Sequence, residues 1–167
     1  VSECAVGINS HGPEWEEFHQ HATKFGMDRL FGGDYGKYDQ KLPSQLIFAA
    51  LRILIDFARE CDYSDEDIRV MEAMTGDIVF AYIAFNGDLI GLTEGIHISG
   101  NSLTVIINGI CGSLNLRCFF YTQYPCENFE ERAVFRYCVA AMTYGDDNIG
   151  SVRPGFDKFN IKDCSHF

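Results

Sequence analysis

The chain has 167 residues, of which 47% are hydrophobic and 14% aromatic, enough to bury the core of one domain and to exclude a disordered chain. Its densest apolar run, 103–110, is too short to span a membrane, and Glu3 and Gly7 interrupt any signal-peptide pattern at the start. The net charge of −11 favours, by itself, an acidic protein that does not bind nucleic acid, because contacts to phosphate require Lys and Arg.

The seven cysteines are scattered, and no two of them form a C-x-x-C pair. An odd number at irregular spacing predicts neither a disulfide framework nor a zinc site. Several lie in apolar surroundings, where reduced cysteine behaves as a small hydrophobic residue. We therefore expect a reducing, intracellular compartment.

The first half of the chain alternates between a short strand and helices. Residues 30–33 read as a strand that leads into Asp34, and Gly36 permits a tight exit from it. Helical spacing of apolar residues predicts a helix from Pro43 to about Glu60. Ser64 is a candidate N-cap for a second helix that ends near residue 74.

The second half is predicted to contain two hairpins and a long helix. Residues 78–85 and 89–92 flank Asn86-Gly87-Asp88, and Asn-Gly is a strong signal for a two-residue turn. Apolar residues from 101 to about 120 predict a long buried helix despite two glycines. Residues 139–143 and 148–152 flank Tyr144-Gly145-Asp146-Asp147 as a second hairpin. No repeat, low-complexity segment or linker is present.

Two acidic motifs follow apolar stretches that read as strands. They are Asp34 with Asp39, and Gly145-Asp146-Asp147. Carboxylates that converge from separate strands are suited to holding two divalent cations for phosphoryl displacement. Taken singly, each motif has an ordinary alternative, a solvated loop for the first pair and a hairpin turn for the second.

A third motif lies between them, from Ser99 to Asn108. Ser99-Gly100 before a helix is compatible with a simple N-cap. Thr104 and Asn108, however, are four residues apart and therefore share one face of an otherwise apolar helix. Buried polar side chains need partners, which either structural contacts or a substrate could supply.

Together the three motifs resemble motifs A, B and C of the viral RNA-dependent RNA polymerases, and in particular those of picorna-like positive-strand RNA viruses. The resemblance covers nearly the whole chain. The matching residues are, in motif order, Asp34 and Asp39; Ser99, Gly100, Thr104 and Asn108; and Gly145, Asp146 and Asp147.

The resemblance implies an α+β fold, with a palm-type antiparallel sheet that carries Asp34 and the Asp146 hairpin and is backed by helices on its other face. Residues 1–167 would be a partial palm with adjoining fingers segments, without the thumb and the remaining fingers. The implied activity is template-directed RNA synthesis from nucleoside triphosphates as part of a viral polyprotein. The implied partners are an RNA template and primer and other replicase proteins, in membrane-associated replication complexes in the host cytoplasm.

The resemblance also implies roles for individual residues. Asp34 and Asp146 would hold two Mg²⁺ ions, with Asp147 assisting and Mn²⁺ as an alternative metal. Asp39 and Asn108 would meet near the nucleotide and hydrogen-bond the ribose 2′-hydroxyl. The residues expected to position the loop and the nucleotide are Ser99, Gly100 and Thr104.

The chain departs from the family pattern at several points. Ile98 stands where many relatives have Pro, and Gly109 where Ser is common. No basic fingers motif precedes Asp34, and Lys158 and Lys162 lie too early to be the lysine that protonates pyrophosphate. Because the chain also lacks an initiator Met and ends inside what reads as a starting helix, we expect it to be a piece of a longer protein and inactive alone.

Two alternatives remain from the sequence. A reverse transcriptase shares the palm and a paired-Asp hairpin, but Asp39, a hydrogen-bond acceptor, stands where such enzymes carry a bulky aromatic residue that excludes the 2′-hydroxyl. An acidic metal-binding interaction module would explain the charge of −11. It would leave the spacing of Thr104 and Asn108 unexplained, and no EF-hand loop is present.

Overall fold

The computed structural model describes residues 3–36, 38–91, 100, 102–125 and 134–164. The chain divides into two compact units, one made of Val1–Tyr35 with Asn108–Phe167 and the other of Gly36–Ile107. Each unit is described by itself below.

The first unit contains most of the strands. Its elements are α1 (Glu14–Ala22), the 3₁₀ turn η1 (Met27–Arg29), β1 (Leu30–Asp34), α5 (Thr104–Gln123) from Asn108 onward, α6 (Phe135–Cys138), β4 (Val139–Tyr144), β5 (Asp147–Val152) and α7 (Ile161–Cys164).

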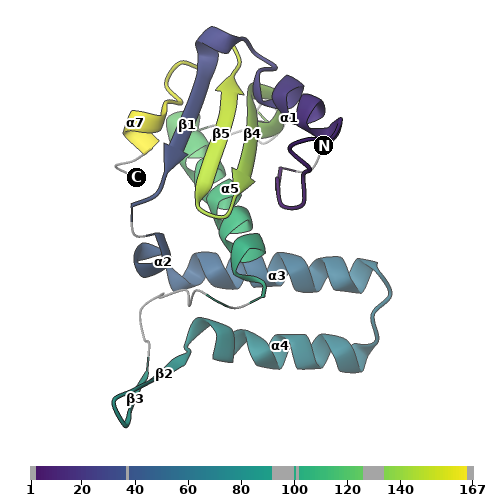
Figure 1. Cartoon of the computed structure of the whole chain (residues 1–167), viewed down its shortest axis with the longest axis vertical. Coiled ribbons are helices and arrows are strands. Elements are labelled where there is room, and N and C mark those ends of the chain that lie inside the picture. The colour runs from purple at the N-terminus through teal and green to yellow at the C-terminus, as the bar shows by residue number, and fades with distance from the viewer. Residues whose placement is uncertain (1–2, 37, 92–99, 101, 126–133, 165–167) are drawn as a thin grey trace. The chain divides into compact units, whose positions relative to one another are not determined.

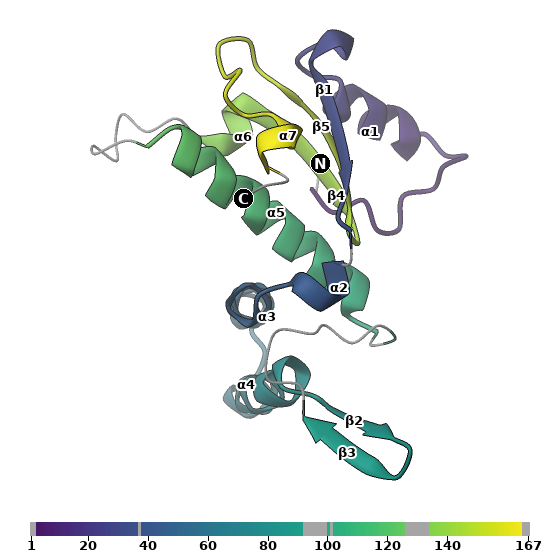
Figure 2. The ribbon, with the colours of Figure 1, turned by 90° about the vertical axis from the view of Figure 1, so that its left-hand side faces the viewer.

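The three strands form an antiparallel sheet in the order β1-β5-β4 (Figure 1). Helix α5 runs along one face of this sheet and α1 lies on the other (Figure 2). Side chains alternate between the two faces along each strand. The sheet is therefore a central layer, and the expected helix-backed antiparallel sheet is confirmed.

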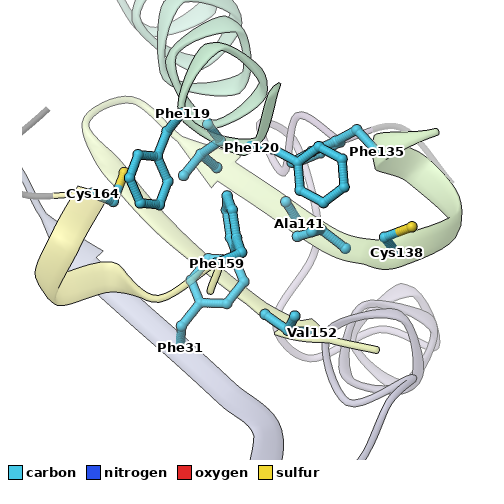
Figure 3. Close-up of a cluster of buried hydrophobic side chains, with 11 residues drawn as sticks. Phe31, Phe119, Phe120, Phe135, Cys138, Ala141, Val152, Phe159 and Cys164 are labelled. Carbon is cyan, nitrogen blue, oxygen red and sulfur yellow. The ribbon is translucent and has the colours of Figure 1, made fainter. Parts of the chain in front are cut away.

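An aromatic core joins α5 to the sheet. Phe119 and Phe120 of α5 pack with Phe31 of β1 and Val152 of β5, and Phe159 closes the cluster (Figure 3). The Phe119 and Phe159 ring centroids are 5.4 Å apart, and those of Phe31 and Phe159 are 5.7 Å apart. Burial of such rings is the main stabilising contribution that this layer offers.

The second unit is mostly helical. Its elements are α2 (Tyr38–Lys41), α3 (Ser44–Glu60), α4 (Asp65–Val79), and the hairpin of β2 (Tyr82–Phe85) and β3 (Asp88–Gly91). Helices α3 and α4 pack through Ile55 and Ile68. Ser64 caps α4, because its hydroxyl accepts a hydrogen bond from the Asp67 N–H at 3.1 Å, as expected.

Several element predictions are confirmed: the strand before Asp34, the helix that ends at Glu60, and both hairpins. Others need correction. Helix α4 continues to Val79, which is fully buried, so the strand begins at Tyr82 and not at residue 78. Asp39 lies in the short helix α2 and not in a loop, and α1 was not predicted. The long helix occupies Thr104–Gln123.

Two further sequence expectations concern the environment of the chain. None of the helices that the structure describes is long and apolar enough to cross a membrane. The six described cysteines are free thiols, and Cys126 lies outside the described residues.

The sheet depends on the absence of a side chain at Gly150 in β5. A Cβ built there would lie 2.2 Å from the Ala140 carbonyl oxygen and 2.9 Å from Cζ of Phe31. We predict that Gly150→Ala destabilises the protein by roughly 3 kcal/mol or more, because a backbone atom cannot move aside as a side chain can.

Thermal unfolding of the intact protein measures this effect. The control is Gly76→Ala in α4, where a Cβ meets nothing within 4 Å. That change should raise stability by about 0.5–1 kcal/mol, since Ala is favoured over Gly in a helix. Equal behaviour of the two variants would contradict the assigned packing of β5.

Candidate active site

Two of the predicted carboxylates face each other across neighbouring strands. Asp34, the last residue of β1, pairs in register with Asp147, the first residue of β5, which in turn pairs with Tyr144 of β4. Because paired residues point to the same face, all three side chains share one face at one end of the sheet. Asp34 and Asp147 are exposed. The register thus brings together residues that are 113 positions (147 − 34) apart in the chain.

The third carboxylate, Asp146, lies in the turn between β4 and β5 and is also exposed. Only Gly145 and Asp146 separate the two strands, and Gly145 has a φ of +61°. Glycine at the first central position with positive φ is typical of a type II′ turn, which matches the twist of the flanking strands. The turn therefore places Asp146 at the hairpin tip, as the sequence predicts, but the register partner of Asp34 is Asp147 and not Asp146.

Like charges directly opposite each other on neighbouring strands destabilise a sheet. A divalent cation would offset this repulsion, and carboxylate oxygens are the ligands that Mg²⁺ prefers. Among the described residues, no group of three or more His, Cys, Asp or Glu side chains is placed to hold a metal. Mg²⁺ is usually held by one or two carboxylates together with water and substrate phosphates, so a carboxylate pair fits this ion better than a structural calcium cage.

Helix α5 approaches the sheet closely behind this edge. A Cβ at Gly109 would lie 3.1 Å from Oγ1 of Thr143, the β4 residue just before Tyr144. The missing side chain at position 109 therefore lets the helix pack against β4. Asn108, the adjacent residue, is buried, and Thr143 is buried as well.

The N-terminal segment covers the outer edge of β4 at the same end. The Thr143 N–H donates to the Glu3 carbonyl at 2.7 Å, and the Ala5 N–H donates to the Thr143 carbonyl at 2.8 Å. Cys4 and Thr143 thereby form a parallel β-bridge. This segment protects an edge that would otherwise leave backbone groups unpaired.

A partly buried ion pair holds that segment in place. The Arg117 guanidinium of α5 donates to both carboxylate oxygens of Glu3, at 2.6 and 2.8 Å, and the Ser113 hydroxyl donates at 2.7 Å. Burial by itself raises the pKa of the Glu3 carboxyl, but these hydrogen bonds and the charge of Arg117 bring the pKa below its ordinary value. The sequence offered no signal for this pair.

An apolar hollow of about 260 Å³ borders Asp147 on the α1 side of the sheet. It is lined by Trp15 and Phe18 of α1, whose rings stack at 5.0 Å, and by Tyr144, Asp147 and Ile149 of the hairpin. The single charged residue among its lining residues is Asp147.

The remaining predicted residues are placed as follows. Asp39 lies in α2 of the second unit, and Thr104 is the first residue of α5. Gly100 is exposed with a φ of +102°, a conformation that glycine adopts readily. Ser99 and Ile98 lie outside the described residues. Asp39 and Asn108 belong to different units, so their meeting at the ribose stays a prediction.

Comparison with known proteins bears on what this site does. The sequence pattern of the family described as "Viral RNA-dependent RNA polymerase" matches residues 1–166. The chain belongs to this family. The resemblance stated from motifs A, B and C is thereby confirmed.

Similar proteins include the genome polyprotein of Deformed wing virus, which is 30% identical over 99% of the chain, and the RNA1 polyprotein of Arabis mosaic virus, 29% identical over 89%. The replicase polyprotein of Drosophila C virus is 26% identical over 97% of the chain. The chain spans only 6% of the first two proteins and 10% of the third.

Among solved structures, the "Sicinivirus 3Dpol RNA dependent RNA polymerase" matches with a TM-score of 0.67 over 92% of this chain and 30% of that chain. Sequence identity is 17%, so this likeness concerns the fold alone. It supports the α+β arrangement expected from the sequence.

The Glu3–Arg117 ion pair provides a test of how the N-terminal segment is held against the edge of β4. We predict that Arg117→Met lowers the free energy of unfolding at pH 7 by about 1–3 kcal/mol, because the Glu3 carboxylate loses charged hydrogen-bond donors. A lowered folded-state pKa stabilises the protein above the ordinary Glu value of 4.5, and this contribution is lost as pH falls through the folded-state pKa. The difference between parent and variant should therefore shrink below pH 4.5.

Chemical denaturation at several pH values measures this difference. The control is Arg52→Met in α3, since Arg52 is 72% exposed and lies 3.5 Å from Asp56. It should change stability by less than about 0.5 kcal/mol. A pH-independent loss for Arg117→Met would show that the guanidinium acts through packing on Phe135 and not through Glu3.

Proposed function

We propose that this chain is the catalytic palm segment of a viral replicase polyprotein that synthesises RNA on an RNA template from nucleoside triphosphates. The observation that carries the proposal is the register of Asp34 with Asp147 beside the Asp146 turn, in a chain of the viral RNA-dependent RNA polymerase family. The rest of the polyprotein would supply the fingers, the thumb and other replicase proteins, and the RNA template and primer would be bound as partners. Synthesis would take place in the host cytoplasm, in membrane-associated replication complexes.

Asp34 and Asp146 would hold two Mg²⁺ ions, or Mn²⁺ in their place, with Asp147 assisting. When bound, such ions neutralise the charge that develops on the attacking and leaving oxygens of phosphoryl transfer. The chain's own contribution is geometric. A two-residue turn and an antiparallel register bring Asp34, Asp146 and Asp147 to one end of the sheet.

Selection of the sugar would depend on Asp39 and Asn108, with Ser99, Gly100 and Thr104 positioning the nucleotide. This assignment rests on the spacing of motifs A and B in a member of the family. Asn108 is 9% exposed and so lies at the edge of the core. A polar side chain in that position lowers stability unless it is hydrogen-bonded. An amide and a carboxylate can both hydrogen-bond a 2′-hydroxyl.

The family match disfavours the two alternatives from the sequence. The matching family is that of the viral RNA-dependent RNA polymerases, and its match covers residues 1–166. It also accounts for the acidic motifs without an interaction module, although Asp34, Asp146 and Asp147 are only 3 of the 24 acidic residues and so contribute a small part of the net charge of −11.

The catalytic assignment is tested by charge removal in the full-length polymerase. We predict that Asp146→Asn and Asp34→Asn each reduce primer extension by at least 100-fold, because losing an anionic ligand costs several kcal/mol of transition-state stabilisation. Extension by purified enzyme at saturating nucleotide is the measurement, with circular dichroism to verify folding.

The second hairpin supplies a matched control. Asp88 follows the Asn86-Gly87 turn and begins β3, as Asp147 follows its turn and begins β5, and both are exposed. Asp88→Asn should extend primers at the parent rate. Extension by Asp146→Asn within threefold of the parent would refute the catalytic role.

Sugar recognition is tested at Asn108. We predict that Asn108→Ala narrows the preference for ribonucleotides over deoxyribonucleotides, mainly by weakening ribonucleotide use, since a site built to bind a hydroxyl discriminates against substrates that lack it. The measurement is the ratio of kcat/KM for the two sugars. Asn115→Ala, two turns further along α5, is the control and should leave the ratio unchanged. An unchanged ratio for Asn108→Ala would reduce Asn108 to a structural residue.

A further inference from the structure

Tyr35 follows Asp34 directly in the chain, and the two side chains point to opposite faces of the sheet. Side chains alternate between the two faces along a strand. Phe31 of β1 packs in the aromatic core against α5. Two residues on, a Cβ built at Gly33 would lie 3.1 Å from Cδ1 of Ile161, which covers the same face. Tyr35 continues this set, whereas Asp34 is exposed and points away from α5.

A hydrogen bond joins Tyr35 to α5. The Asn115 side chain donates from Nδ2 to the Tyr35 hydroxyl at 3.2 Å, and both side chains are half-buried. Burial raises the pKa of the Tyr35 hydroxyl above its ordinary value of 10.0, and the hydrogen bond from Asn115 offsets this in part. The phenol is therefore neutral at pH 7 and adds no negative charge next to Asp34.

This hydrogen bond is located where the pairing of β1 with β5 ends. Asp34 and Asp147 form the last register pair, so Tyr35 lies one residue beyond it. The ends of paired strands open easily, and the repulsion of two facing carboxylates favours opening here. A contact from Tyr35 to a long helix opposes that opening in the strand that carries Asp34.

A second tyrosine of the same unit makes a similar bond far from the carboxylates. The hydroxyl of Tyr124, directly after α5, accepts a hydrogen bond from the Lys158 N–H at 2.9 Å. Its ring packs on Phe120, with the centroids 5.1 Å apart. Neither Tyr124 nor Lys158 is adjacent in the chain to a predicted site residue, so this bond serves the fold alone. The bond of Tyr35 differs because one of its partners is covalently next to Asp34.

We propose that Tyr35 and Asn115 are positioning residues whose hydrogen bond holds the end of β1 from the α5 face and so keeps the Asp34 carboxylate in place for a divalent cation. Their side chains act through the backbone and do not touch the cation. Binding is stronger when the ligands are held in the bound arrangement in advance. The inference rests on the proposed function for the role of Asp34, but the pairing of the strand can be measured without a cation.

The test compares Tyr35→Phe with the parent in the full-length polymerase. This variant removes the hydroxyl and keeps the ring. Without metal, hydrogen–deuterium exchange over residues 30–35 should be at least about threefold faster in the variant. The dissociation constant for Mn²⁺, measured by electron paramagnetic resonance without substrate, should rise about three- to tenfold, the size of effect that one hydrogen bond can have.

Asn115→Ala removes the other partner of the same bond, so it should reproduce both effects. The double variant, Tyr35→Phe with Asn115→Ala, should bind Mn²⁺ no more weakly than the weaker-binding single variant, because each change removes the same interaction. Since the loss acts through the metal, it should affect ribonucleotides and deoxyribonucleotides alike. This agrees with the unchanged sugar ratio expected for Asn115→Ala.

Tyr124→Phe is the matched control, because it also removes a hydroxyl that accepts one hydrogen bond. It should leave the exchange over residues 30–35 and the affinity for Mn²⁺ unchanged. If Tyr124→Phe weakened Mn²⁺ binding as much as Tyr35→Phe, the effect would be a general loss of stability and the positioning role would be refuted.

Two further results would overturn the proposal. One is exchange at the parent rate with Mn²⁺ affinity within about twofold, in both Tyr35→Phe and Asn115→Ala. The other is a double variant whose loss of affinity equals the product of the two single losses, which would mean that the side chains act independently. Asp34→Asn separates these failures from that of the proposed function. If Asp34→Asn leaves Mn²⁺ binding intact, the cation assignment is wrong, whereas the exchange result still decides whether Tyr35 holds the end of β1.

Discussion

The pairing of β1 with β5 through their last residues is the constraint on which the site depends. Asp34 and Asp147 are register partners, so a slip of one residue would move one carboxylate to the opposite face of the sheet. Glycines help to hold the register. Gly150 admits Phe31 and the Ala140 carbonyl at distances that a Cβ would not allow, and Gly33 lets the Ile161 side chain pack closely over β1. The catalytic edge is thus specified by what lies behind it.

The N-terminal segment and α5 serve the same edge from the β4 side. The Cys4–Thr143 bridge links the start of the chain to β4, and the Glu3–Arg117 ion pair links it to α5, each more than 100 positions later. Gly109 lets that helix approach Thr143 closely. Strand β5 is therefore held by its pairing with β1, and β4 by the N-terminal segment and α5. These contacts limit how far the Asp146 turn can move relative to β1.

The sequence predicted the elements whose signals are local. Asn86-Gly87 and Gly145-Asp146 specify two-residue turns through backbone conformation alone, and the structure has both hairpins. The predicted start of a strand at residue 78 was wrong, because a short apolar run is compatible with the buried end of a helix as well as with a strand. Glu3 and Arg117 were missed for a different reason. Their roles depend on contacts between distant segments, and nothing in their local sequence distinguishes them.

The layer between the sheet and α5 divides into two regions of opposite character. At one end it holds Phe119, Phe120, Phe135 and Phe159, which stabilise the fold by burying apolar surface. Toward the carboxylates it holds polar groups instead, among them Thr143 and Asn148. Buried polar groups lower the stability of a fold unless they are hydrogen-bonded, so the polar end contributes less to stability than the aromatic end does. The aromatic end offsets this deficit by burying large apolar side chains, so one layer combines a stable core with a polar region behind the site.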